Sequence, residues 1–168
     1  VKTRRHLHEN PESSLKEFET AAFIQKELTS FGVPFEKVGE TGTLAIIKGG
    51  KGDGRTVLLR ADIDALELPD CTEKPYASKR PGLNHACGHD AHTAMGLGTA
   101  KLLNDIKDTF SGTVKIAFQP AEEIGAGAKQ FVASGQIDDI DESFAIHVNS
   151  SLPVGTFAVQ GGPVNASC

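Results

Sequence analysis

Apolar side chains recur along this chain with two periods, one typical of helices and the other of strands. Residues 12–31 have mostly helical spacing and are followed by Gly32, a common helix stop. A second helix is predicted to open at Asp90 or His92 and to run to Leu103, and a third is predicted over 127–134. Short runs that are apolar, or that alternate with polar residues, predict strands at 33–38, 43–48, 56–59, 113–118, 144–146 and 155–159.

The order of these segments indicates the fold class. Strands alternate with helices, which predicts an α/β protein with a mainly parallel sheet. Two stretches are predicted to be loops: the glycine-rich residues 49–54, which lack a phosphate-binding pattern, and the polar residues 70–83. The 168 residues contain no internal repeat and are enough for one domain with its own core.

Composition excludes several classes of protein. A formal net charge of -5 argues against a nucleic-acid partner, which would require a basic stripe. No apolar run approaches the roughly 18 residues of a membrane span, and the basic start of the chain is not followed by the apolar core of a secretory signal. The cysteines Cys71, Cys87 and Cys168 are odd in number and widely spaced, so we expect free thiols and a cytoplasmic location.

The run His85–His92, with the sequence HACGHDAH, carries the strongest chemical signal. It places a thiol and an imidazole two residues apart and follows them with an acid and a second imidazole. The adjacent carboxylates Glu122 and Glu123 come thirty residues later. Thiolate, imidazole and carboxylate together are typical ligands of a transition metal. A carboxylate that is not a ligand could act as the base in metal-assisted hydrolysis.

Polar residues of interest also follow the predicted strands. Asp62 and Asp64 follow the strand at 56–59, the glutamate pair follows the strand at 113–118, and His147 follows Ile146. Ligand sites of open parallel sheets form at the carboxyl ends of the strands, so we expect these side chains to converge. Cys87 and His89 are predicted to enter a helix, a position that favours a thiolate through the helix dipole.

Each of these residues also has a structural interpretation. Cys87 alone could be a small buried apolar residue, and the glutamate pair could be a solvated part of a loop. Asp62 and Asp64 could form a turn or cap a helix, and His147 could be a hydrogen-bonded histidine at a strand end. His6 and His8, beside two arginines, are most simply a solvated or ion-paired cluster.

Five segments in a fixed order make the chain recognisable: RRHLHENPE at 4–12, LRADIDAL at 59–66, HACGHDAH at 85–92, FQPAEE at 118–123 and IHV at 146–148. The chain thereby resembles the di-metal amidohydrolases related to aminoacylase. The branch is that of hippurate hydrolases, N-acyl-L-amino-acid amidohydrolases and auxin-conjugate hydrolases. The resemblance implies a three-layer α/β/α catalytic domain of the zinc-peptidase type, with a mainly parallel mixed sheet.

The resemblance also implies a role for each matching residue. Cys87 resembles the ligand that bridges two divalent metal ions, which could be zinc, manganese or cobalt. His89 resembles a terminal ligand, and Glu123 and His147 resemble ligands of one metal each. Glu122 resembles the general base, and Asp64 a supporting carboxylate. His92 is expected to be a helix-start residue rather than a ligand, and Asp90 to orient the site from behind.

The resemblance further implies that residues 1–168 are the N-terminal portion of the catalytic domain. Relatives have a lid domain after a segment like 160–168, and the lid supplies a histidine near the reacting carbonyl and a homodimer contact. One further metal-binding histidine follows the lid. Departures from the family pattern at Asn84, 65–69 and Asn149 lie beside the expected substrate region and bear on specificity.

The implied activity is metal-dependent hydrolysis of the amide bond of an N-acyl amino acid, a small-molecule substrate. A metallo-carboxypeptidase or a dipeptidase of the same family is the alternative within enzymes. A metal-binding protein without activity, or an inactive fragment, is the alternative outside them.

Overall fold

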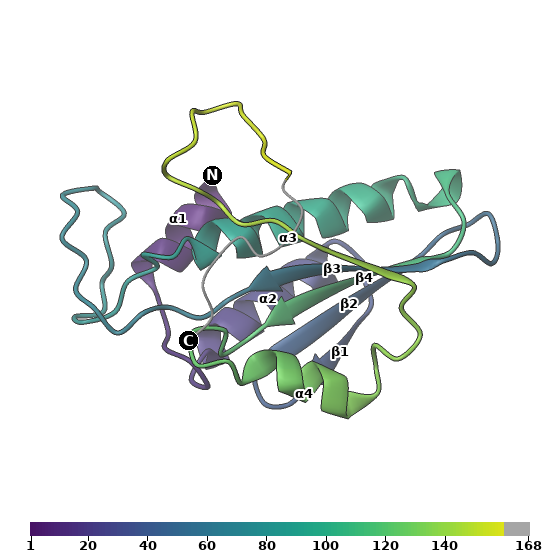
Figure 1. Cartoon of the computed structure of the whole chain (residues 1–168), viewed down its shortest axis with the longest axis horizontal. Coiled ribbons are helices and arrows are strands. Elements are labelled where there is room, and N and C mark those ends of the chain that lie inside the picture. Colours follow the sequence, from purple (N-terminus) through teal and green to yellow (C-terminus); the bar gives the residue numbers. More distant parts are fainter. Residues whose placement is uncertain (160–168) are drawn as a thin grey trace.

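The structure, a computed structural model, describes residues 1–159. Its helices are α1 (Lys2–Glu9), α2 (Phe18–Ser30), α3 (His89–Asp105) and α4 (Gly127–Ser134), with a 3-10 turn at Lys107–Thr109. Its strands are β1 (Phe35–Val38), β2 (Gly42–Lys48), β3 (Thr56–Asp62), β4 (Thr113–Gln119) and β5 (Glu142–Ala145). Figure 1 shows them around one central sheet.

The sheet has the strand order β1-β2-β4-β3-β5. β3 runs parallel to both β4 and β5, whereas β2 runs antiparallel to β1 and β4. The predicted mixed sheet is therefore confirmed, with its parallel part confined to β4, β3 and β5. The short connection from β1 to β2, in which Gly39 has a φ of 60°, forces those two strands into a hairpin. α3 and α4 provide the longer crossovers that parallel strands need.

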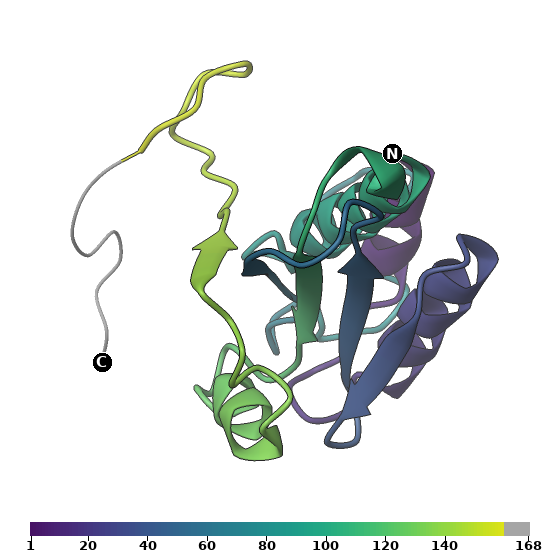
Figure 2. The same ribbon diagram turned by 90° about the vertical axis from the view of Figure 1, so that its right-hand side faces the viewer.

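Helices cover both faces of the sheet, which confirms the three-layer α/β/α architecture. Figure 2 shows α2 and α4 on opposite sides of the strands. One core joins α2 and α3 to the sheet around the fully buried Ile24 and Phe118. A second, smaller core packs Phe131 of α4 against Leu44 and Leu58. These apolar layers hold the strand ends, and the polar residues that follow them, in fixed positions.

Three elements differ from the sequence predictions. α1 was not predicted, because it buries only Leu7 and His8 and so shows little apolar periodicity. α2 begins at Phe18 rather than near residue 12, and the carboxylate of Glu12 accepts backbone N–H bonds from Glu19 and Thr20 at its start. The predicted strand at 155–159 is wrong, since that segment is exposed and pairs with no strand in the described part. The predicted junction at 160–168 and Cys168 lie outside the described residues.

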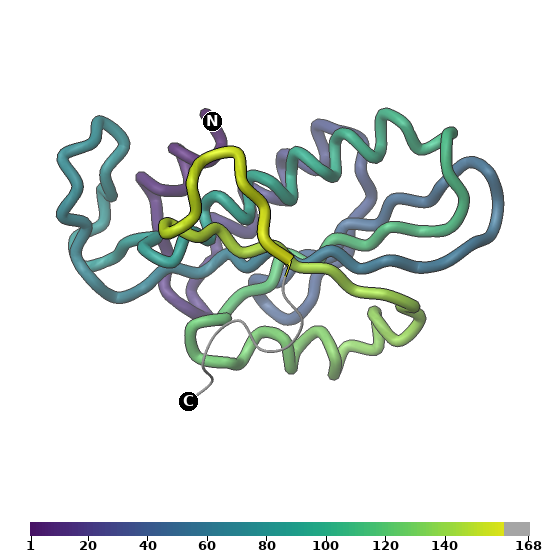
Figure 3. Tube along the Cα trace, turned by 45° about the horizontal axis from the view of Figure 1, so that its top comes forward, coloured from purple at the N-terminus to yellow at the C-terminus, as the bar shows by residue number. Residues whose placement is uncertain are grey.

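The segment at 70–83 is a loop, as predicted, and it projects from one end of the molecule in Figure 3. The Asp70 carboxylate anchors it by accepting backbone N–H bonds from Ser78 and Thr72, both at 2.8 Å. These bonds lower the pKa of Asp70 to about 2. Lys79 and Arg80 form ion pairs with carboxylates near α1 and α2. These ion pairs therefore hold the end of the loop against α1 and α2, just before the His85–His92 run.

Among the described helices, none has the length and apolar character of a membrane span.

Candidate metal centre

The candidate site lies where β3, β4 and β5 end. The arrowheads of β3 and β4 point to the same end of the sheet in Figure 1. Asp62 is the last residue of β3, Glu122 follows β4 closely, and His147 comes two residues after β5. The expected convergence of these segments is confirmed: ligand atoms of His89 lie within 4.8 Å of those of Cys87 and His147, and of both glutamates.

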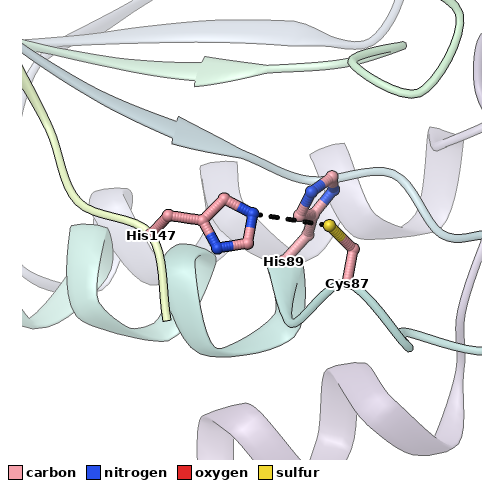
Figure 4. Close-up of side chains that lie close together, drawn as sticks. All are labelled: Cys87, His89 and His147. Atoms are coloured by element: carbon pink, nitrogen blue, oxygen red, sulfur yellow. Dashed lines mark hydrogen bonds between the residues drawn. The ribbon is translucent and has the colours of Figure 1, made fainter. Parts of the chain in front are cut away.

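Cys87, His89 and His147 form one group of potential ligands (Figure 4). Cys87 and His89 flank Gly88, which caps α3 in the left-handed conformation with a φ of 94°. The Cys87 Sγ atom lies 3.4 Å from His147 Nε2. Because His147 Nδ1 donates to the Val148 carbonyl at 2.7 Å, Nε2 is the acceptor and the thiol is the donor. A loop thiol and an imidazole sixty residues away thus meet side by side.

His89 also faces the glutamate pair. Its Nε2 lies 3.8 Å from Glu122 Oε2 and 3.8 Å from Glu123 Oε1. Nε2 of His89 and Oε1 of Glu123 are buried and have no hydrogen-bond partner in the described part of the chain. Buried polar atoms without partners are costly, and a cation between them would remove that cost. The donor set therefore fits a divalent transition metal.

Asp64 fixes the orientation of the His89 ring through contacts to Nδ1, the ring nitrogen that faces away from the glutamates. The Nδ1 of His89 donates to the Asp64 backbone carbonyl at 2.9 Å and lies 3.3 Å from its Oδ1. The other carboxylate oxygen accepts from the Ser14 hydroxyl at 2.7 Å and from the Glu123 backbone N–H at 3.0 Å. Burial opposes ionisation of Asp64, but these hydrogen bonds outweigh it and lower its pKa. Burial opposes a charge on His89, but the hydrogen bond to Asp64 and the neighbouring carboxylates outweigh it and raise the pKa of the imidazole. With one proton held on Nδ1, a cation bound at Nε2 would take the place of the second proton.

The thiol of Cys87 differs from the sequence prediction. Burial and the negative charges of Glu123 and Asp62 raise its pKa to about 12. The expectation that the start of α3 favours a thiolate is therefore wrong for the protein without a cation, since burial and the neighbouring carboxylates favour the neutral thiol. The same crowding of negative groups gives the site an electrostatic preference for cations. A divalent ion beside the sulfur would reverse the balance and favour the thiolate.

His92 and Asp62 form a third potential group with His89, but His92 is not available as a ligand. Its Nδ1 lies 2.6 Å from Asp62 Oδ1, and its Nε2 accepts the Val148 backbone N–H at 2.9 Å. Both ring nitrogens are therefore occupied. His92 lies in the first turn of α3, in agreement with the sequence analysis, and it is also fully engaged in hydrogen bonds there.

The sequence analysis did not identify Glu17, which supports the turn that carries the glutamate pair. Its fully buried carboxylate accepts the Ala121 backbone N–H at 2.8 Å and the Thr41 hydroxyl at 2.9 Å. Burial raises the pKa of Glu17, although these bonds partly oppose it. Ala121 has a φ of 50°, which is unusual for a residue with a side chain. A single glutamate before a helix carries no sequence signal for this role.

The N-terminal RRHLHENPE segment has a structural role in the described chain. The carboxylate of Asp90 accepts from His8 Nδ1 and pairs with Arg4, both at 2.7 Å. The two histidines of this segment differ: His8 is buried and hydrogen-bonded to the Asp90 carboxylate, whereas His6 is exposed. These contacts tie α1 to the first turn of α3, next to His89. Asp90 therefore fixes the position of α3 against α1 and does not hydrogen-bond any of the proposed ligands.

His85 is buried, and burial lowers its pKa to about 4.

The fold and the site together define an α/β domain with a candidate centre for divalent cations at its parallel strand ends. Residues 58–163 match the sequence model of a family that is described as Peptidase family M20/M25/M40, so the chain belongs to that family. The resemblance found in the sequence is thereby confirmed.

Known proteins of this family cover almost the whole chain. The N-acetyl-L-cysteine deacetylase of Bacillus subtilis is 47% identical over 98% of the chain and 39% of its own length. Thermostable carboxypeptidase 2 of Saccharolobus solfataricus is 44% identical over 99% of the chain and 43% of its own length. The crystal structure of the Bacillus subtilis YXEP protein, described as a dinuclear metal binding peptidase, superposes with a TM-score of 0.93 at 45% identity. It is matched over 96% of this chain and 46% of its own. The chain thus spans less than half the length of each relative.

Proposed function

We propose that this chain forms part of a metal-dependent amidohydrolase that cleaves the amide bond of N-acyl amino acids. One observation carries the proposal: the buried Nε2 of His89, which has no hydrogen-bond partner among residues 1–159, lies 3.8 Å from a carboxylate oxygen of both Glu122 and Glu123, so that one carboxylate can bind a cation while the other remains free. A protein that only stored metal would have no use for a spare carboxylate.

Cys87, His89, Glu123 and His147 are the residues that would hold two divalent cations, and the thiol is the one that would serve both. The dinuclear description of the YXEP protein supports the number of cations. Sulfur and imidazole ligands favour zinc, and the carboxylates also suit manganese or cobalt. When bound, the cations supply Lewis acidity, which polarises a carbonyl and makes a nearby water more acidic.

Glu122 is the proposed general base. It lies at the edge of the site, partly exposed, and its Oε1 is 3.8 Å from the Arg60 guanidinium. Glu122 takes a proton from the water that attacks the amide carbonyl and then gives this proton to the leaving amine. A carboxylic acid and a free amino acid are the products. Glu122 and Glu123 are neighbours in the turn after β4, and the side chain of Glu122 is the more exposed of the two, 38% against 20%, which suits a base that meets water while Glu123 binds a cation.

The substrate class is drawn from the relatives. A deacetylase and a carboxypeptidase match the chain at 47% and 44% identity, so identity alone does not separate the two activities. The spare base and the cation ligands serve either reaction. We place the N-acyl amino acid first because the sequence motifs resemble that branch, and we keep carboxypeptidase action as the second candidate.

The rest of the protein completes the proposal. We infer that residues 1–168 are the N-terminal portion of a catalytic domain that also requires a lid domain, a further histidine ligand and a homodimer contact. The relatives, more than twice as long as the matched region, support this inference. We also expect a cytoplasmic enzyme, in which the thiol ligand stays reduced.

A substrate panel tests the proposal. The full-length protein, loaded with zinc, manganese or cobalt, is offered N-acetyl and N-benzoyl amino acids beside peptides with a free carboxyl terminus. Release of amino acid from the acyl substrates, abolished by a chelator and restored by metal, is the expected result. Preferential cleavage of the peptides would favour the carboxypeptidase instead. No hydrolysis of either class at full metal loading would refute the proposed activity.

A further inference from the structure

We propose that His92 is a positioning residue that sets His147 against Cys87 by holding the backbone of Val148. The inference rests on the proposed function, because it concerns the geometry of one proposed cation ligand. His92 itself contacts neither substrate nor cation in this account. It acts through the backbone of the residue that follows His147.

The hydrogen bonds of His92 define its role. Its ring is only 3% exposed and lies in the first turn of α3. The Nδ1 atom donates to Asp62 Oδ1 at 2.6 Å, which leaves Nε2 as the acceptor for the Val148 backbone N–H at 2.9 Å. A neutral imidazole of one defined tautomer therefore connects the end of β3 to the segment that follows β5.

Asp62 fixes the imidazole from behind. Its carboxylate is 1% exposed, and its second oxygen lies 2.9 Å from Arg60 Nη1. Its backbone carbonyl accepts from the Thr93 hydroxyl at 3.1 Å, so β3 and α3 are joined at this point. Asp62 thus serves His92 as Asp64 serves His89. Two carboxylates, two residues apart on the same chain segment, each hydrogen-bond Nδ1 of one histidine, and the second oxygen of Asp62 also lies 3.5 Å from Nε2 of His89.

The segment that carries His147 depends on this support. β5 ends at Ala145, and residues 146–149 belong to neither a helix nor a strand. In the described chain, two side-chain hydrogen bonds tie residues 147 and 148 to α3 and the turn before it: Cys87 to His147, and Val148 to His92. Only the bond to His92 remains available if the thiol becomes a cation ligand.

Two further contacts favour the same arrangement. The rings of His92 and His147 meet edge to face, with centroids 4.6 Å apart and an interplanar angle of 77°. Val148 lies so close to Gly88 that a Cβ atom at residue 88 would overlap its Cγ2 atom. The glycine between Cys87 and His89 therefore leaves room for the side chain of Val148, the residue whose backbone N–H His92 accepts. Both contacts favour a position of His147 next to Cys87 and His89.

Four proteins and one further control variant test the inference: the four are the full-length wild type and its His92→Phe, His92→Gln and His147→Ala variants. Phe keeps most of the ring volume and removes both hydrogen bonds, whereas Gln retains one donor and one acceptor. Met95→Leu, a change on the half-exposed surface of α3, is the control. The readouts are the number and affinity of bound cobalt ions and the thiolate-to-cobalt absorption band, with thermal unfolding measured in parallel.

We expect His92→Phe to weaken one cobalt site by about 10- to 100-fold, as losses of supporting partners do in other metal sites. The other site should be retained, the pattern should resemble that of His147→Ala, and His92→Gln should recover at least part of the loss. Wild-type cobalt binding in His92→Phe would overturn the inference. So would equal loss of both sites in the Phe and Gln variants, since that indicates a general folding role. Absence of cobalt binding by the wild type would instead refute the proposed metal centre itself.

Discussion

The Nδ1 atom of His89 lies 2.9 Å from the backbone carbonyl oxygen of Asp64, and this contact turns the opposite ring nitrogen toward Glu122 and Glu123. The relationship joins the end of β3 to the start of α3. It makes a buried imidazole, rather than the thiol, the centre of the site, because ligand atoms of both candidate groups lie within 4.8 Å of it.

Asp64→Asn should weaken cation binding by about 10- to 100-fold, because the variant loses the charge that supports His89 and alters the acceptor of the Glu123 N–H. Titration of the metal-free full-length protein with zinc measures the change. Asp105→Asn, on the exposed end of α3, is the control and should bind as wild type. Unchanged zinc affinity in Asp64→Asn would show that this carboxylate does not orient a ligand.

Cys87→Ala should lose the bound cations, since the proposed bridging ligand is removed from both. Elemental analysis of the purified full-length protein gives the metal content directly. The matched control is Cys71→Ala, which removes an exposed free thiol of the 70–83 loop. Two ions retained per chain in Cys87→Ala would contradict the bridging role.

Glu17→Ala should destabilise the protein by about 1–3 kcal/mol, because it leaves the buried N–H of Ala121 without a partner. Glu17→Gln should cost less, since the amide oxygen can still accept that bond. Denaturant unfolding measures both, and the exposed Glu36→Ala serves as the control. Equal stability of Glu17→Ala and wild type would mean that the carboxylate does not support the 120–123 turn.

The loop at 70–83 should loosen at acid pH. The pKa of Asp70 is about 2 in the folded chain, below its ordinary value of 3.8, so the charged form favours the folded loop. That stabilisation is complete above about pH 4 and is lost as the pH falls through about 2. The difference in unfolding free energy between wild type and Asp70→Asn should therefore shrink as the pH drops from 6 toward 3. Asp53→Asn, on an exposed loop, is the control, and a difference that grows on acidification would contradict the assignment.

The sequence predicted the parts of the site that depend on local patterns. β3 and β4 are apolar runs followed by acids, and parallel strands bring such ends together, so Asp62, Asp64 and Glu122 lie at the strand ends as expected, while their roles stay predictions. The start of α3, predicted at Asp90 or His92, lies at His89, because the spacing of apolar residues along a helix is also a local pattern.

Other features depend on partners distant in the sequence. Glu17 meets Ala121 across 104 positions, and His92 meets Val148 across 56, so no local pattern could reveal either bond. The raised pKa of Cys87 has the same origin: it arises from burial and from carboxylates that the fold brings near, whereas the helix start alone suggested the opposite. Residue type indicated the chemistry of the site, but tertiary contacts determine the charge state and orientation of each group.

The division of labour between Glu122 and Glu123 is the central claim, and a paired measurement of metal content and turnover tests it most directly. The full-length Glu122→Gln variant should keep both cations and lose at least about 100-fold in hydrolysis of an N-acetyl amino acid, as expected for a missing general base. Glu123→Gln should instead lose a cation. Near-wild-type turnover in Glu122→Gln, or the same metal loss in both variants, would contradict the account.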